Sequence, residues 1–325
     1  MAPHLVDVSR AFAGVSHERI AQDVRVTLAP HTYLPDGELT QGWLPNILDA
    51  FRSLGRRLSS ATRPVRSFAS IGVGPGLEVI AAAELLGVDR FVLTDLHADV
   101  TKTAKENVLR NVRGLTSGDI EAFVSDLCAG LIERQIAVDV LYENLPNLPA
   151  LPEEVSEGAL SASFFDREKA RSIPRVYAEH RLTLHYHFLS QARRCVTTGG
   201  RVVCCIGGRI PMRLVRSMFE EHGFTADVLH FAMVRQFESE KVLDGYVQAE
   251  EETGITFRFF PFEEAAATLA RIREEQPRLE DIESDAQWNA LALTARQAHD
   301  LEAGGTAIGH LGVVWQGVPS PADTV

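Results

Sequence analysis

The sequence has few cysteines and no recognisable arrangement of metal ligands. Four cysteines in 325 residues provide no disulfide framework (Cys128, Cys195, Cys204 and Cys205). We interpret them as small buried side chains in a reducing compartment. No Cys/His spacing is typical of zinc, and His185 and His187, two apart in an expected helix, point in different directions. We therefore expect no metal.

Long apolar runs are also missing. None approaches the roughly 18 residues needed to cross a bilayer. The first residues, MAPHLVDVSRAFAG, lack the basic, apolar and small-residue blocks of a signal peptide. These absences predict a cytoplasmic protein without a membrane partner.

Positive charge is scarce. The chain has 32 Lys and Arg against 44 Asp and Glu, a formal net charge of −12. Nucleic-acid binding depends on cations that neutralise phosphates, so this balance argues against a nucleic-acid partner. One arginine cluster, within residues 52–66, is interpreted as a solvated helix face. A small-molecule or protein substrate is favoured.

A glycine-rich segment, SFASIGVGPGLE at residues 67–78, is the most informative motif. It predicts a strand, a turn containing Gly72, Gly74 and Gly76, and then a helix. Glycines allow a sharp turn and close approach of a ligand, and the N–H groups of the helix favour an anionic group. Leu77 stands where the dinucleotide fingerprint GxGxxG needs its third glycine. An ordinary strand–turn and a divergent NAD or FAD site remain alternatives.

Two acids follow at the ends of expected strands. Asp95 ends RFVLTD and is followed by Leu96; an acid at this point of a βαβ nucleotide site accepts hydrogen bonds from ribose hydroxyls. Alternatively, Asp95 caps the next helix. Asp126 and Leu127 lie in VSDL, after the next strand-like segment.

The GxGxG turn and the two acids together resemble the S-adenosylmethionine (SAM) site of class I methyltransferases. The resemblance implies that Asp126 hydrogen-bonds the adenine amino group and that Leu127 covers the ring. Ser70 stands where most members carry an acid that contacts the amino group of the cofactor. Ser70 can hydrogen-bond but supplies no charge, so Glu78 is a candidate substitute.

The order of expected elements predicts an α/β fold, a Rossmann-like class I methyltransferase sheet with helices on both faces. The SAM-binding core covers residues 66–235, and its last strand covers 308–318. Residues 1–65 form an N-terminal helical extension, with helices near 17–26 and 45–58, that acts as a substrate lid. One long helix is expected over 167–196. Residues 236–307 form a long insertion with helices near 262–275 and 285–299, interpreted as a cap or the surface of a homodimer.

An apolar strand is expected over 138–142, and the acceptor loop at its end reads Tyr142-Glu143-Asn144-Leu145-Pro146-Asn147. It resembles the Asn-Pro-Pro-Tyr loop of amino-group methyltransferases, in which the Asn side chain and the first Pro carbonyl accept hydrogen bonds from the target amino group. Leu145 replaces the first proline, and Asn147 stands in place of the aromatic ring. A proline-rich turn shaped for the backbone alone is the alternative.

We predict Glu143, Tyr142 and Asn144 as catalytic residues, because a carboxylate and a phenol at this mouth can handle a proton. Tyr33 and Tyr177, with Asn144, are predicted to contact the substrate. Other aromatic and histidine side chains nearby are candidate walls, or packing residues (His17, His31, Trp43, His180, His185, Tyr186 and His187).

The YENLPN loop and the extra segments at both ends are similar to bacterial indole C3-methyltransferases, which form pyrroloindolines. This resemblance implies SAM-dependent methyl transfer to a small heteroaromatic, indole-type substrate in specialised metabolism. The rivals are a protein or peptide N-methyltransferase of the glutamine-modifying type, a catalytically silent SAM-fold binding protein, and an NAD oxidoreductase.

Overall fold

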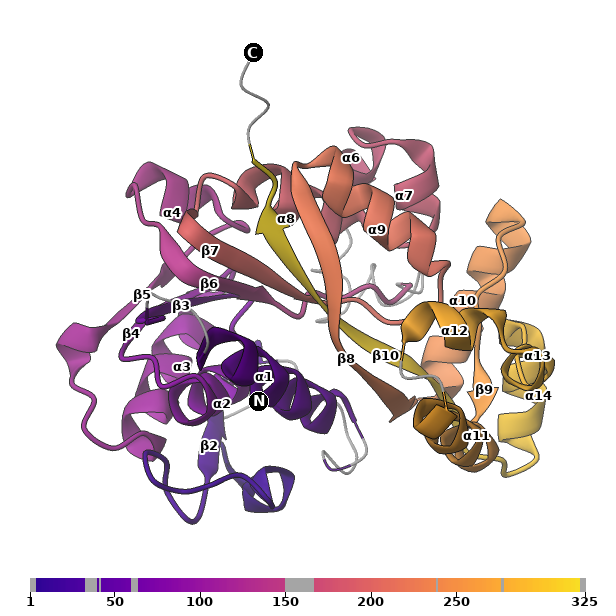
Figure 1. Ribbon diagram of the computed structural model, residues 1–325, viewed down its shortest axis with the longest axis horizontal. Coiled ribbons are helices and arrows are strands. Elements are labelled where there is room, and N and C mark those ends of the chain that lie inside the picture. The colour runs from indigo at the N-terminus through magenta and orange to yellow at the C-terminus, as the bar shows by residue number, and fades with distance from the viewer. Residues whose placement is uncertain are drawn as a thin grey trace.

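The computed structural model describes residues 4–32, 40, 42–59, 64–149, 167–237, 239–275 and 278–321. Within these ranges, a mixed eight-stranded sheet has the order β5-β4-β3-β6-β7-β10-β8, and β9 pairs with β10 (Figure 1). The neighbours from β5 to β7 are parallel, whereas β10 is antiparallel to β7 and to β8. The strands span Ser67–Ile71 (β3), Arg90–Asp95 (β4), Ile120–Val124 (β5), Val138–Glu143 (β6), Val196–Cys205 (β7), Phe224–Arg235 (β8), Phe260–Pro261 (β9) and Ile308–Pro319 (β10).

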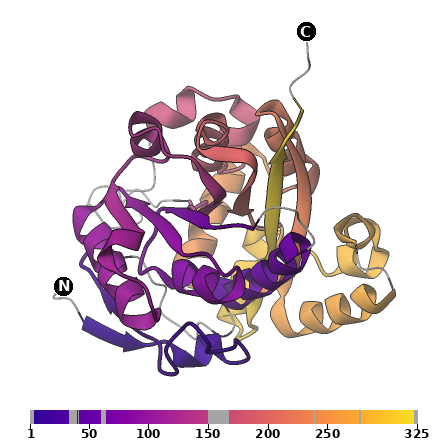
Figure 2. The same cartoon turned by 60° about the vertical axis from the view of Figure 1, so that its left-hand side comes forward.

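Helices cover both faces of this sheet, as Figures 1 and 2 show. Side chains alternate along the strands, so Phe68 joins one hydrophobic core while Ala69 and Ile71 join the other. The first core includes α1 (Trp43–Ser59), α2 (Leu77–Leu85) and α3 (Ala98–Asn111), and the second includes α4 (Ala129–Glu133), α8 (Thr183–Ala192) and α9 (Met212–Glu221). The predicted α/β fold, a Rossmann-like sheet with helices on both faces, is confirmed.

The N-terminal segment differs from its prediction. Strand β1 (His4–Asp7) pairs with β2 (Arg25–Leu28), and the 3-10 helix η1 (Ser9–Phe12) lies between them, so a helix at 17–26 is wrong. The backbone N–H groups of Arg25 and Thr27 donate to the Asn111 and Asn107 side chains of α3, at 3.0 and 2.8 Å. These bonds hold the segment extended along α3. The second predicted helix is confirmed as α1.

The predicted long helix at 167–196 is interrupted. It forms α6 (Arg167–Arg171), α7 (Arg175–Glu179) and α8, and Val196 already belongs to β7. Pro174 precedes α7 as its N-cap, where its missing N–H breaks the helical hydrogen-bond ladder. Arg181, between α7 and α8, has a φ of 61°, which reverses the chain.

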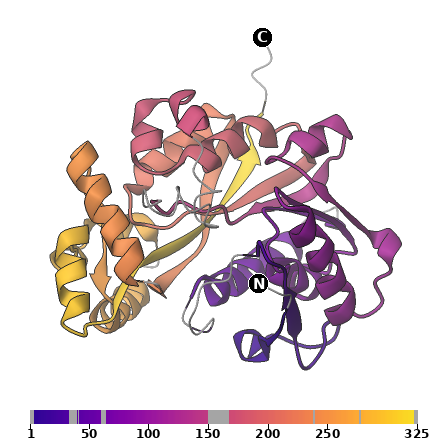
Figure 3. The same ribbon diagram turned by 180° about the vertical axis from the view of Figure 1, so that it is seen from behind.

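The insertion contains helices α10 (Ser239–Thr253), α11 (Phe262–Glu275), α12 (Leu279–Ser284), α13 (Ala286–Ala290) and α14 (Ala295–Ala303). Figure 3 shows them at one end of the molecule, opposite the N-terminal strands. The helix expected at 285–299 is two helices, because Asp285 caps α13 and Thr294 caps α14. None of the helices in the described ranges has the length and apolar composition to cross a membrane.

Candidate functional site

A cleft of about 480 Å³ runs along the sheet edge where β3, β4, β5 and β6 end. The loops after β7 and β8 and the first residues of β10 line it too, because β10 runs in the opposite direction. Its volume lies in the usual range for ligand pockets, about 300–1,000 Å³. Open α/β sheets bind ligands at this carboxyl edge.

The glycine turn contributes Gly72 and Gly74 to the cleft. Both have positive φ, 67° and 52°, which glycine adopts without strain. A Cβ on Gly74 would meet no atom within 4 Å, so this backbone faces open space. Gly76, with φ of 87°, does not line the cleft; a Cβ there would lie 3.3 Å from Val108 Cγ2. Gly76 therefore serves the packing of α2 on α3.

Asp95 lies in the cleft beside this turn. Its carboxylate accepts the backbone N–H of His97 at 3.2 Å and that of Gly74 at 3.4 Å. Burial raises the pKa of Asp95, while these hydrogen bonds oppose the rise. Residue His97, rather than Asp95, is the N-cap of α3, so the capping alternative does not explain Asp95. Leu96, 48% exposed, also lines the cleft.

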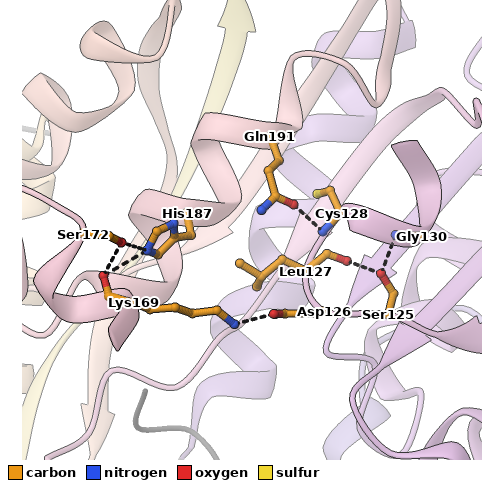
Figure 4. A network of polar contacts seen from close by, with 9 residues as sticks. All are labelled: Ser125, Asp126, Leu127, Cys128, Gly130, Lys169, Ser172, His187 and Gln191. Carbon is orange, nitrogen blue, oxygen red and sulfur yellow. Dashed lines mark hydrogen bonds and ion pairs between the residues drawn. The ribbon is translucent and has the colours of Figure 1, made fainter. Parts of the chain in front are cut away.

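Asp126 and Leu127 line the next part of the cleft. Figure 4 shows that the Asp126 carboxylate pairs with Lys169 of α6, at 2.5 Å. Leu127 has a φ of 50°, and its carbonyl accepts the Ser125 hydroxyl at 2.9 Å. The Ser125 oxygen in turn accepts the Gly130 N–H at 2.9 Å. This network fixes the turn between β5 and α4.

Glu78, rather than Ser70, supplies a carboxyl group to the cleft wall. Ser70 is 1% exposed and does not line the cleft, so the structure contradicts a side-chain contact with a ligand there. Glu78 is 6% exposed and follows the glycine turn on α2. Burial raises its pKa to about 7, while hydrogen bonds, including those from Tyr142 and Asn144, oppose the rise.

The structure contradicts the predicted contact of Glu143 and Tyr142 with a substrate in this cleft. Neither side chain lines it, and both are buried. Glu143 accepts the Leu145 N–H at 2.8 Å and contacts His185 Nδ1 at 2.9 Å. Tyr142 lies on the opposite face of β6 and donates its hydroxyl to Glu78 at 3.3 Å. Both support the acceptor loop or the cleft wall, and of the three predicted catalytic residues Asn144 lines the cleft.

The substrate contact predicted for Tyr177 is wrong. Tyr177 is 2% exposed, packs beside Tyr186 with ring centroids 5.2 Å apart, and donates its hydroxyl to Glu221 at 2.5 Å. It does not line the cleft because its side chain packs into the hydrophobic core. The predicted Tyr33 contact lies outside the described residues. His31 and Trp43 from the N-terminal segment do line the cleft.

The other half of the cleft contains three polar residues that sequence analysis missed. Arg209 follows β7, Gln236 follows β8, and His310 lies at the start of β10. An Arg209 Nη2–H donates to Gln236 Oε1 at 2.6 Å, and Nη2 lies 3.0 Å from His310 Nδ1. These residues could have been identified from the sequence by their position next to apolar strands, at the edge of the sheet where the parallel strands end.

Asn46 and a histidine cluster were missed as well. Asn46 of α1 is 3% exposed and lines the cleft, and neither its amide oxygen nor its nitrogen has a hydrogen-bond partner in the described part of the chain. His31, His97 and Asp99 bring potential metal-ligating atoms within 4.8 Å of one another. The His31 and His97 rings stack with centroids 4.6 Å apart, and His31 Nδ1 lies 3.0 Å from the Asp99 carboxylate. These contacts account for the cluster without an ion.

Comparisons with known proteins give similarities in fold only. No family model matches the sequence, and no curated protein matches it significantly. The chain is similar to a ribosomal protein L11 methylase from Lactobacillus delbrueckii subsp. bulgaricus (16% identity, 69% of this chain and 91% of that one, TM-score 0.36). It is also similar to a candidate RNA methyltransferase from Pyrococcus horikoshii (12%, 97% and 96%, TM-score 0.44). A SAM-dependent methyltransferase from Agrobacterium tumefaciens is a third (12%, 91% and 68%, TM-score 0.43). Because these TM-scores are below 0.5, they carry no weight in assigning a function.

Proposed function

We propose that this protein is a SAM-dependent methyltransferase. The observation that carries the proposal is convergence: four segments with independent sequence signals meet in one cleft. Gly74, Asp95, Asp126 and Asn144 come from the ends of four different parallel strands, and each lines that cleft. A strand–turn formed for packing alone does not require the other three residues beside it.

The residues of the cleft fit this cofactor. The open backbone at Gly74 admits a ligand at van der Waals distance. Asp95 would accept hydrogen bonds from the ribose hydroxyls, and Asp126 with Leu127 would hold the adenine. Glu78 would pair with the α-ammonium group, which offsets the cost of burying its charge.

When bound, SAM supplies an electrophilic methyl group on a sulfonium. The contribution of this chain is positioning, because displacement needs the reacting atoms about 3–3.5 Å apart and in line. Glu143 fixes the backbone of the acceptor loop by accepting the Leu145 N–H, and His185 in turn contacts Glu143. Asn144 is thereby held in the cleft, where its side-chain oxygen can accept a hydrogen bond from an acceptor N–H.

The acceptor we propose is a small, planar, indole-type heteroaromatic of specialised metabolism. Trp43, Leu145 and Phe237 give the cleft apolar walls for a ring. Asn147 in place of an aromatic argues against the glutamine-modifying type. Tyr246 of α10 donates its hydroxyl to the Asn147 carbonyl at 3.0 Å, so the insertion braces the acceptor loop. This contact supports the assignment of the insertion, residues 236–307, as a cap.

Calorimetry with S-adenosylhomocysteine and with NADH tests the cofactor assignment. We expect the first to bind and the second not to bind. Gly74→Ala should weaken S-adenosylhomocysteine at least tenfold. Gly87→Ala is the matched control, because Gly87 also has positive φ (67°) and no atom within 4 Å of a Cβ, yet lies outside the cleft. Tighter binding of NADH, or equal effects of the two variants, would refute the proposal.

Labelled-methyl SAM then tests the acceptor. The protein is incubated with indoles and with glutamine-containing release-factor peptides, and labelled products are identified by mass spectrometry. Methylated indole is the expected product. Labelled peptide would favour the N-methyltransferase rival, and cofactor binding without any transfer would favour a catalytically silent binding protein.

A further inference from the structure

Arg209 is a buried cation that faces the cleft without an acidic partner among the described residues. It is 6% exposed and lines the cleft. Its guanidinium lies 5.4 Å from the ring centroid of Tyr246 and 5.9 Å from that of Phe259. Its Nε–H is buried and has no hydrogen-bond partner within the described ranges. A buried charge in this state is costly unless something else pairs with it.

The neighbours of Arg209 orient it without neutralising it. The Gln236 side-chain oxygen accepts from Nη2 at 2.6 Å. Burial and the adjacent Arg209 charge hold the pKa of His310 well below its usual range. Neutral His310 therefore accepts from Arg209 through Nδ1, at 3.0 Å, and carries its proton on Nε2. Gln236 and His310 are thus both neutral, so they orient the guanidinium without cancelling its positive charge.

The cleft is consequently asymmetric in charge. Glu78, Asp95 and Asp126 lie on the half formed by α2 and the ends of β4 and β5, which is the half assigned to the cationic cofactor. Asp126 already pairs with Lys169. Arg209 lies on the other half, formed by the ends of β7 and β8 and the start of β10. An acceptor that binds there meets a positive charge.

We propose that the acceptor carries a carboxylate and that Arg209 binds it, with Gln236 and His310 as positioning residues. This inference rests on the proposed methyltransferase function and narrows its substrate to aromatic acids. A guanidinium suits a carboxylate because a charged N–H donor makes a strong hydrogen bond to an ionised oxygen. Nη2 already donates to Gln236 and His310, so Nη1 is the group that would donate to the carboxylate. A carboxylate carries one negative charge, which matches one buried arginine.

Matched acid and amide probes test this. Indole-3-acetate and indole-3-acetamide, and benzoate and benzamide, differ in charge but hardly in shape. We expect the wild type, saturated with S-adenosylhomocysteine, to bind an acid at least tenfold more tightly than its amide by calorimetry. Arg209→Gln should reduce this preference below threefold, and Arg209→Lys should retain part of it. Arg235→Gln is the control, because Arg235 also lines the cleft but is exposed.

The outcomes separate the two proposals. Each variant is first titrated with S-adenosylhomocysteine, and unchanged affinity shows that the fold and the cofactor half are intact. If the wild type fails to bind S-adenosylhomocysteine, the methyltransferase proposal fails, while the acid–amide comparison, repeated without S-adenosylhomocysteine, still tests Arg209. If no acid is preferred over its amide, if Arg209→Gln keeps the preference, or if Arg235→Gln removes it equally, the carboxylate site is refuted.

Discussion

Glu78 gives the sharpest prediction about this cleft, because its buried carboxyl makes stability depend on pH. Burial raises its pKa from the ordinary 4.5 to about 7. Below pH 4.5 the group is protonated in both the folded and the unfolded chain. Between these two values the unfolded chain loses the proton while the folded protein keeps it. The contribution of Glu78 to stability therefore falls as the pH rises from 4.5 to about 7, and it is constant above that.

The size of this effect follows from the same two values. At about 1.4 kcal/mol for each pKa unit, the rise from 4.5 to about 7 costs about 3 kcal/mol of unfolding free energy once the carboxylate is ionised. Glu78→Gln removes the ionisation and keeps an oxygen that can accept the Tyr142 hydroxyl. The variant should match the wild type near pH 4.5 and exceed it by about 3 kcal/mol at pH 8.

Urea unfolding at half-unit pH steps measures this difference. Glu84→Gln is the matched control on the same helix. Burial raises the Glu84 pKa, but hydrogen bonds from Ser16 and from the backbone of residues 18–20 lower it overall. That variant should lose stability, relative to the wild type, as the pH rises above the acidic range. A Glu78→Gln difference that stays constant across the range would refute the reasoning. Cofactor binding below pH 7 should also release a proton from Glu78, detectable by calorimetry in two buffers.

Two further substitutions test the roles assigned to buried residues. Glu143→Ala leaves His185 and the Leu145 N–H without their buried partner, so it should lower the unfolding free energy by about 3–5 kcal/mol; a loss below 1 kcal/mol in urea unfolding would contradict the anchoring role. Tyr177→Phe removes one partly buried hydrogen bond to the exposed Glu221, so it should cost about 1 kcal/mol of stability and leave the S-adenosylhomocysteine affinity unchanged; a tenfold loss of that affinity would restore Tyr177 as a cleft residue.

Short sequence motifs predicted the half of the cleft that we propose for the cofactor. The alternation of strands and helices, the glycine turn and the strand-end acids are each written within a few residues. Parallel strands bring their carboxyl ends to one edge, so the placement of Gly74, Asp95 and Asp126 follows once the sheet is predicted. The ligand contact predicted for Ser70 was wrong because Ser70 still belongs to β3, where its side chain is buried.

The predicted start of the acceptor loop was wrong for a similar reason, because the strand before it is one residue longer than predicted. The sequence indicated a strand over 138–142, but β6 extends to Glu143. Side chains alternate along a strand, so Tyr142 and Glu143 enter the two opposite cores, and the loop begins at Asn144. The prediction of one helix over 167–196 was wrong because Pro174 interrupts it and because Val196 already belongs to β7.

Arg209 could not be found by a local motif, since its partners Gln236 and His310 lie 27 and 101 residues further along the chain. The sheet topology explains why they meet. Because β10 is antiparallel to β7 and β8, its first residues lie at the edge where those strands end. The insertion leaves the sheet after β8 and returns at β10, so it begins and ends beside the half of the cleft that we propose for the acceptor. Its contact through Tyr246 with Asn147 follows from this path. We therefore expect changes within the insertion to alter which acceptor is bound, without disturbing the glycine turn and the acids that line the other half of the cleft.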